Sequence, residues 1–446
     1  QDVISLSEKE IDFLISIAKK TTRKRVRLCC HLSVNDAVHE MVIVHPRKAY
    51  VRPHRHLNKA ESFLVLKGEV DYVTFKEKGE IDTIMKPVDS IRYYKHFLRS
   101  SLMSMEPQTG HVKAWVGGVN YKHFQYDMVK QGKRQIGSAF KPFVYATAID
   151  QLHLSPCDML PDIPFCIEKN KYGNPEEWCP KNSGEKYGGY RTLKNALANS
   201  VNSITAQLID KVGPQPVIDL AHSLGIEQGI LSVPSIALGT PDLSVYEMVA
   251  AYSTFANKGV YTRPVMITSI EDKNGTILFQ LTPETKDVLS EEVAYVMVNL
   301  LEGVTQYGSG VRLRTKGADA YRTDFREIIT GYPYEFTNPI AGKTGTTQNQ
   351  SDGWFMGMVP NLVTGVWVGA EDRAVHFSSI TYGQGAAMAL PIWALYMKSC
   401  YDDAELNVST EDFEKPDNLS IELDCEKYQG NLKKKGITDD DSEIDF

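Results

Sequence analysis

The segment from Gly132 to Tyr145 places Ser138 three residues before Lys141, inside an otherwise apolar run. If Ser138 lies at the start of a helix, the two side chains share a face, with their bases roughly 5 to 6 Å apart. The Lys141 amine then reaches the Ser138 hydroxyl, and Pro142 is tolerated because first-turn amides have no intrahelical partner to lose. The positive end of the helix dipole also favours an alkoxide there. This spacing predicts a serine nucleophile with a lysine base.

A lysine accepts a proton only when its amine is uncharged, and at its ordinary pKa only about 0.04% is free amine at pH 7. Burial and a second cation both lower a lysine pKa, and Lys343 is the candidate cation. Lys343 is followed by Thr344, Gly345 and Thr346. We expect the charge and the two hydroxyls to hold an anionic substrate, while Gly345 lets the backbone approach that substrate. The backbone amides of Thr346 and Ser138 would form an oxyanion hole.

A third group consists of Ser200 and Asn202, separated by one valine. Ser200 could relay a proton between a lysine and a leaving group, and Asn202 could orient a substrate carbonyl. Short patterns also arise by chance: residues 183–186 repeat the serine-lysine spacing, and residues 33–35 repeat the serine-asparagine spacing. Taken singly, these patterns favour plainer readings: Ser138, Ser200 and Asn202 as helix-capping residues, Lys141 as a surface residue and Lys343 as an exposed strand charge.

The elements that must position these residues can be read from periodicity. Capping boxes at residues 7–10 and 244–247 predict helices, the second ending before Gly259. Two alternating runs at 102–118, joined by a turn at 107–110, predict a hairpin; residues 352–371 predict another, and the strand of Lys343 is expected beside it. Strands at both ends of this unit with helices between them predict one antiparallel sheet with helices packed on it, an α+β fold.

Composition bounds the domain count and excludes some functions. A chain of 446 residues and 50.0 kDa suggests two or three units. A net charge of −7 argues against a general nucleic-acid binder, and the basic run at 19–27 reads as a solvated helix end. No apolar run of about 18 residues or signal peptide is visible, and the first residue is Gln, as in a fragment or processed product.

We expect four segments along the chain. They are a β-rich unit at 1–80 that begins with a helix, a connecting segment at 81–100, a unit at 101–405 and a frayed polar tail at 406–446.

Seven cysteines cannot all pair. Cys166 and Cys179 bracket a loop that contains Gly, Pro and Asn, where a disulfide helps most in an oxidising compartment. A bridge there and two free thiols are both open outcomes. Cys29 and Cys30 are expected in a core.

The three motifs occur in the order serine-x-x-lysine, serine-x-asparagine and lysine-threonine-glycine, which is typical of penicillin-recognising serine acyl enzymes. Residues 85–425 resemble the transpeptidase domain of class A penicillin-binding proteins, whose fold is shared with serine β-lactamases. The resemblance extends to the stretches 104–118, 135–150, 178–184, 237–260 and 342–357.

The resemblance implies that Ser138 is acylated by the penultimate D-alanine of a peptidoglycan stem peptide, with loss of the terminal D-alanine. The acyl group then passes to an amine of a neighbouring stem, and β-lactams trap the serine. Lys141 would be the general base, Ser200 the proton shuttle and Asn202 a substrate contact, with Lys343, Thr344 and Thr346 on the carboxylate-binding strand. No metal or organic cofactor is implied, and no nucleic acid.

By resemblance the protein works in the periplasm, at the outer face of the inner membrane. The glycosyltransferase domain and membrane anchor that precede such transpeptidases are missing from this chain, so membrane association is expected only through those segments.

The first unit has a different resemblance. His54, His56, Glu61 and Gly68 follow the spacing of the first cupin motif, and residues 20–77 resemble small cupins of the WbuC type. The two histidines and Glu61 would be ligands for a divalent metal. The histidine of the second cupin motif is missing, so we expect an incomplete β unit; whether it folds or binds metal stays open. A gene fusion or rearrangement would explain these absences.

Two other functions compete with transpeptidation. The same acyl-enzyme could be hydrolysed, as in a D,D-carboxypeptidase or a β-lactamase, although no base for a β-lactamase's deacylating water is identifiable. Alternatively, the cupin-like unit binds a sugar or metal and the second unit only senses β-lactams.

Overall fold

The computed structural model describes residues 7–22, 25–29, 41–45, 65, 68, 70, 72–75, 81–85, 87–122, 124–316, 332–428 and 430. The chain forms two compact units, residues 1–87 and 88–446. The expected metal ligands His54, His56 and Glu61 lie outside the described residues, as does the 33–35 segment.

The described part of the first unit consists of one helix and two pairs of short antiparallel strands. Helix α1 (Glu8–Lys20) begins at the expected capping box, in which Ser7 and Glu10 exchange hydrogen bonds. Strand β1 (Val26–Cys29) pairs with β2 (Met41–Val44), and β3 (Tyr72–Phe75) pairs with β4 (Ile81–Met85). Cys29 is exposed, so its expected core position is wrong, because it lies at the end of a strand that is only partly covered.

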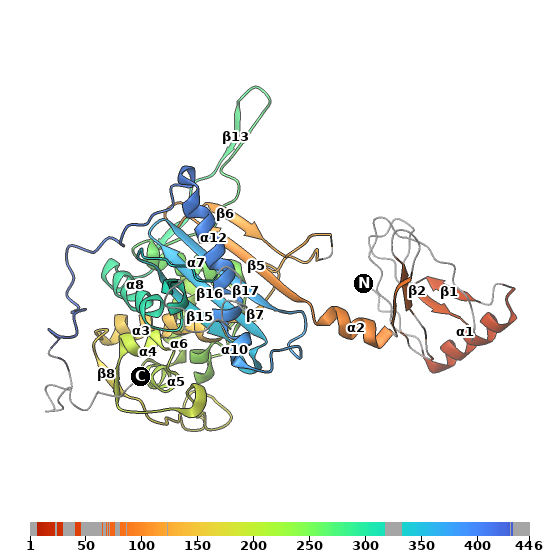
Figure 1. Ribbon diagram of the computed structural model, residues 1–446, viewed down its shortest axis with the longest axis horizontal. Coiled ribbons are helices and arrows are strands. Elements are labelled where there is room, and N and C mark those ends of the chain that lie inside the picture. Colours follow the sequence, from red (N-terminus) through yellow and green to blue (C-terminus); the bar gives the residue numbers. More distant parts are fainter. Residues whose placement is uncertain are drawn as a thin grey trace. The chain divides into compact units, whose positions relative to one another are not determined.

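The second unit is built on a five-stranded antiparallel sheet in the order β15-β16-β17-β5-β6 (Figure 1). The expected hairpin pairs β16 (Asp352–Val359) with β17 (Leu362–Ala370), and β15 (Ala341–Thr346), which carries Lys343, lies beside it as predicted. The earlier hairpin of β5 (Leu98–Met105) and β6 (Val112–Val116) joins the sheet through β17. The α+β prediction is therefore confirmed.

Helices cover both faces of this sheet. All eight residues of β16 are buried, and its side chains alternate between two cores. Trp354 and Met356 face the core shared with α3 (Lys141–Leu152), α7 (Val245–Ala256) and α8 (Glu291–Gln306). Phe355 faces the core of α11 (Gly385–Met388) and α12 (Leu390–Asp402). Because both faces are closed, these strands read as apolar runs.

The remaining helices and strands surround this framework. The other α-helices in the described ranges are α2 (Pro87–Lys95), α4 (Leu193–Ala198), α5 (Asn202–Val212), α6 (Pro214–Ser223) and α10 (Ile380–Gly383). The other strands form the pairs β7 (Arg134–Gln135) with β10 (Asp242–Leu243), β8 (Met159–Pro161) with β9 (Tyr190–Thr192), β11 (Val260–Thr262) with β14 (Thr285–Asp287), and β12 (Ser269–Glu271) with β13 (Ile277–Gln280).

The boundaries between segments differ from those expected. Residues 81–100 are not a free connection, because β4 pairs within the first unit and β5 already pairs with β17 from Leu98. Among the described residues, no helix has both the length and the apolar composition needed to cross a bilayer.

The expected frayed tail is wrong for residues 406–428. Phe413 is buried in the larger core, and Leu419, Ile421 and Leu423 pack against it. A disulfide joins Cys425 to Cys157, and a second joins Cys166 to Cys179, the pair left open above. A few apolar residues and one cross-link thus fix a segment whose composition is mostly polar.

Candidate active site

Ser138 lies in a single 3-10 turn, η1 (Gly137–Phe140), directly before α3. The backbone N–H of Lys141 donates to the carbonyl oxygen of Ser138, and Pro142 occupies the first turn of α3, as the sequence suggested. Residues three apart lie on the same side of a 3-10 turn, so the Ser138 and Lys141 side chains share a face. Ser138 is half-buried, and no hydrogen bond among the described residues engages its hydroxyl.

The turn that carries Ser138 is held by contacts that sequence reasoning missed. Arg134 Nε donates to Asp352 Oδ1 at 2.7 Å, and both side chains are buried. The indole N–H of Trp354 donates to the Gln135 carbonyl oxygen at 2.8 Å. The Tyr252 hydroxyl donates to the Ala139 carbonyl oxygen at 2.6 Å. These partners come from β16 and α7, so the core itself fixes the serine.

The Lys141 amine is fully buried and surrounded by oxygen atoms. Its Nζ lies 2.5 Å from Ser200 O, 2.6 Å from Asn202 Oδ1 and 3.2 Å from Ser200 Oγ. Carbonyl and amide oxygens only accept, so they take both hydrogens of a neutral amine. Its lone pair is then left for a hydroxyl, which is the arrangement that a general base requires.

A second buried lysine completes this group. Lys343 Nζ donates to Ser200 Oγ at 3.0 Å and to the Thr344 carbonyl oxygen at 3.1 Å. Burial lowers the pKa of Lys343 to about 7. Burial, and then the charge of Lys343, hold the pKa of Lys141 well below its usual range. Both causes are those inferred from the sequence, with burial the larger.

Ser200 lies between the two amines, in the short connection from α4 to α5. Its backbone has a φ of 58°, a left-handed conformation that is uncommon for residues other than glycine. Such strain persists where the surroundings enforce it and is concentrated at functional sites. Asn202 is the first residue of α5, and its Nδ2 donates to the Lys181 carbonyl oxygen at 2.7 Å.

The threonines of β15 are engaged within the protein. Thr344 Oγ1 lies 2.6 Å from Ser309 Oγ, and Thr346 Oγ1 accepts from the Gly385 N–H at 3.0 Å. Gly345 has a packing reason that the sequence did not suggest, and its expected role toward the substrate stays a prediction. A Cβ there would lie 2.5 Å from the carbonyl oxygen of Ile136, so glycine is needed for the contact of β15 with the serine-bearing segment.

The two amides expected to form the oxyanion hole, those of Ser138 and Thr346, lie in η1 and at the end of β15. Gly137, with a φ of 55°, packs so closely on β15 that an added Cβ would lie 3.1 Å from the Thr346 amide nitrogen. Among the described residues, the Ser138 N–H has no hydrogen-bond partner. The assignment of these two amides to an oxyanion stays a prediction.

The competing serine-lysine pair is in a different environment. Ser183 and Lys186 are both exposed, and no hydrogen bond joins their side chains. The one three-residue group with metal-ligand geometry in the described ranges is Cys166, Glu177 and Cys179, whose sulfur atoms form a disulfide. Bridged sulfur is no thiolate ligand, so this group gives no reason to expect a metal.

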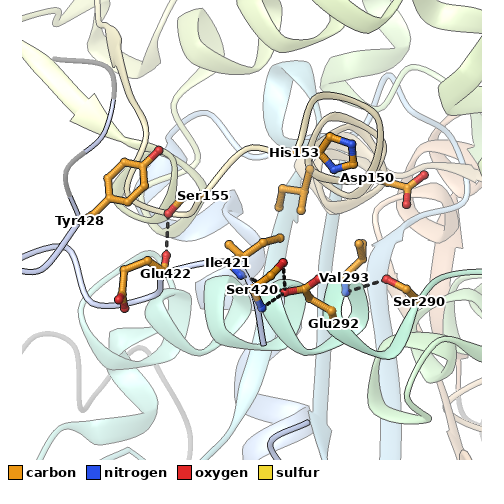
Figure 2. Close-up of a pocket in the computed structure, with 11 residues that line it drawn as sticks. Asp150, His153, Ser155, Ser290, Glu292, Val293, Ser420, Ile421, Glu422 and Tyr428 are labelled. Carbon is orange, nitrogen blue, oxygen red and sulfur yellow. Dashed lines mark hydrogen bonds between the residues drawn. The ribbon is translucent and has the colours of Figure 1, made fainter. Parts of the chain in front are cut away.

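A pocket of about 460 Å³ lies at the other end of α3, lined among others by Asp150, His153, Glu292 and Tyr428 (Figure 2). At 1.5 Å per residue, His153 is about 18 Å along the helix from Lys141. The pocket is therefore separate from the serine-lysine group. Ser420 and Ile421 form part of its wall and bind the Glu292 carboxylate.

Comparison with known proteins assigns the family. The family model "Penicillin binding protein transpeptidase domain" matches residues 101–372, and that of a domain of unknown function, DUF6016, matches residues 6–86. The second match names no function, so the cupin resemblance stays a prediction.

Two curated relatives illustrate the similarity. The chain is 35% identical to penicillin-binding protein 1A of Aquifex aeolicus over 332 residues. These residues are 73% of this chain and 41% of that protein. It is 32% identical over 308 residues to penicillin-binding protein 1A of Neisseria lactamica, 68% of this chain and 36% of that protein. The chain thus spans less than half the length of these relatives.

Solved structures agree with this fold. Penicillin-binding protein 1A from Haemophilus influenzae matches with a TM-score of 0.58 and 26% identity, over 78% of this chain and 52% of that one. The PonA1 protein from Mycobacterium tuberculosis in complex with penicillin V matches with a TM-score of 0.55 and 23% identity. This match covers 79% of this chain and 90% of that one. With the transpeptidase match extending over more than half of its length, the chain belongs to the penicillin-binding protein transpeptidase family.

Proposed function

We propose that this chain is a serine-type D,D-transpeptidase that cross-links peptidoglycan stem peptides and is acylated by β-lactams. The observation that carries the proposal is the buried Lys141 amine, which donates to two obligate acceptors beside a second buried lysine. An amine held in this way keeps its lone pair for a hydroxyl proton.

The proposed first half-reaction is acylation. Lys141 takes the proton of Ser138 as the serine oxygen attacks the carbonyl carbon of the penultimate D-alanine. The negative charge that develops on the carbonyl oxygen is bound by the N–H groups of Ser138 and Thr346. When the peptide bond breaks, the proton passes from Lys141 through Ser200 to the departing D-alanine amine, which leaves an ester on Ser138.

Substrate binding falls to β15. The terminal carboxylate lies against Lys343, Thr344 and Thr346, and its charge restores the protonated form of a lysine whose pKa is about 7. Asn202 contacts the substrate amide through the second hydrogen of its Nδ2. In the second half-reaction the amine of a neighbouring stem attacks the ester, and its proton returns along the same route to Ser138.

The relatives named penicillin-binding protein 1A support a site of action outside the cytoplasm, and we place the protein in the periplasm.

The test is intact-mass measurement after exposure to penicillin. We expect the mass of one drug molecule to be added, to be lost in Ser138→Ala and to be retained in Ser183→Ala, whose serine begins the competing motif. Labelling that persists in Ser138→Ala would refute the assignment. Incubation with a stem peptide ending in D-Ala-D-Ala then separates the alternatives: a cross-linked dimer supports transpeptidation, whereas only shortened monomer indicates a carboxypeptidase. Rapid drug turnover indicates a β-lactamase.

A further inference from the structure

The Asn202 carboxamide is fixed in one orientation by two partners. Its Oδ1 accepts from Lys141 Nζ at 2.6 Å, and its Nδ2 donates to the Lys181 carbonyl oxygen at 2.7 Å. If the amide were turned over, two oxygens would face each other at Lys181. Asn202 Nδ2 would then donate a hydrogen bond to the lone pair of the Lys141 amine, which could no longer accept a proton from a hydroxyl. The backbone of residue 181 therefore decides which atom of Asn202 faces the amine.

The next residue, Asn182, holds the start of α5. Its Oδ1 accepts from the backbone N–H groups of Asn202 and Ser203, each at 3.0 Å. These first amides of the helix have no intrahelical partner, and the N-cap residue Val201 has no side chain that could accept from them. Asn182 therefore performs the capping function from a segment 20 residues earlier in the chain.

Asn182 is in turn held by a buried carboxylate. Asp162 is 1% exposed, and its Oδ1 accepts from Asn182 Nδ2 at 2.7 Å and from Ser203 Oγ at 2.6 Å. Its Oδ2 accepts from Arg191 Nε at 2.7 Å. Every polar atom of this path has a defined partner, so the position of Asn202 follows from that of Asn182.

We propose that Asn182 is a positioning residue that acts through Asn202 to aim the lone pair of the Lys141 amine. The inference rests on the proposed function, because it concerns the base of the acylation step. When Asn202 holds one hydrogen of the amine and the Ser200 carbonyl holds the other, the lone pair has one direction. When Asn202 shifts, the amine rotates about its Cε–Nζ bond and the base loses that direction.

The test measures how fast penicillin acylates the full-length chain. We expect Asn182→Ala to lower the first-order acylation rate constant by about 10- to 100-fold, as small displacements of catalytic groups do. The dissociation constant of the initial drug complex should change much less than this rate constant, because β15 holds the drug carboxylate and Asn202 adds a single amide contact to it. The rate constant is independent of the fraction of folded protein, so partial unfolding lowers only the labelled amount.

Asn174 offers a matched control in the same loop. It is 4% exposed against 8% for Asn182, and its Nδ2 donates to the Glu168 and Glu176 carbonyl oxygens. Asn174→Ala should lower the melting temperature as much as Asn182→Ala and leave the acylation rate constant within about twofold. An equal loss of rate in both variants would overturn the inference.

A double variant tests the route through Asn202. In an Asn202→Ala background, adding Asn182→Ala should have less than about a threefold effect; a full additional loss would mean that Asn182 acts by another route, and it would count against the inference. If the unsubstituted chain is not labelled at Ser138, the proposed function itself fails, which is a separate result.

Discussion

Lys141 and Lys343 are both buried, and within the described part of the chain their hydrogen bonds all go to neutral oxygen atoms, with no carboxylate among the partners. Burial disfavours the charged form of a lysine, and a neighbouring cation disfavours it further. The same two effects that destabilise the ammonium form make Lys141 a base near neutral pH. The group thus gives up folding stability for reactivity, as strained functional sites do.

The contribution of Lys343 can be measured from pH dependence. Lys343→Met removes a positive charge next to Lys141, so the ammonium form of Lys141 is less disfavoured and its pKa rises. Acylation needs the free amine, so the acid limb of the rate profile should move to higher pH. The measurement is the penicillin acylation rate from pH 5 to 9. Lys286→Met, at an exposed site, is the control and should leave the limb unchanged. A shift to lower pH would contradict this account.

At the scale of elements, the contact between β15 and η1 sets the distance from the substrate-binding strand to the nucleophile. Gly345 has no space for a side chain, because a Cβ would approach both Ile136 O and the Cβ of Ala139. The strand can therefore lie close enough for the Thr346 and Ser138 amides to act together. A glycine expected from the sequence to let the backbone approach the substrate is also needed for the packing of two elements.

Gly345→Ala tests this contact. We expect a loss of about 1–3 kcal/mol in the free energy of unfolding from overpacking. We also expect acylation at least about tenfold slower, because β15 is pushed from the serine. Gly229→Ala is the control, since no heavy atom lies within 4 Å of the added Cβ. Denaturant unfolding and drug labelling measure the two effects. Full labelling speed in Gly345→Ala would show that the contact does not set the site geometry.

At the scale of the whole molecule, the Cys157–Cys425 disulfide spans 268 residues and fastens the C-terminal segment to the core. Replacing both cysteines with serine should cost about 2–4 kcal/mol of stability, because the unfolded chain regains freedom over a long loop. Thermal melts of the oxidised protein with and without reductant measure this. Reductant should have little further effect on a variant that lacks both disulfides. Equal melting temperatures for oxidised wild type and the Cys157/Cys425 double variant would contradict the expectation.

The sequence predicted the parts of this molecule whose signal is local. Ser138, Lys141 and Lys343 lie in short motifs whose order is itself informative, and the sheet followed from alternating runs. Asn182 lies in a stretch that carries the resemblance, 178–184, but nothing there indicates its role, which exists only once its loop lies against α5.

The pairing of Cys157 with Cys425 likewise depends on tertiary contact across most of the unit. The polar composition after residue 405 concealed Phe413, a single buried anchor. Predictions from local pattern therefore failed where one residue or one distant contact decides the structure.

The order of strands in the sheet has a consequence for biosynthesis. Met105 of β5 pairs with Val363 of β17, which is made far later. At about 5–20 residues per second, the ribosome delivers that partner on the order of ten seconds or more afterwards. During this interval the inner edge of β5 is unpaired while every intervening helix emerges, and an open strand edge is a template for association between chains. The nascent protein is thus most vulnerable before its last hairpin appears, and chaperone cover matters most in that interval.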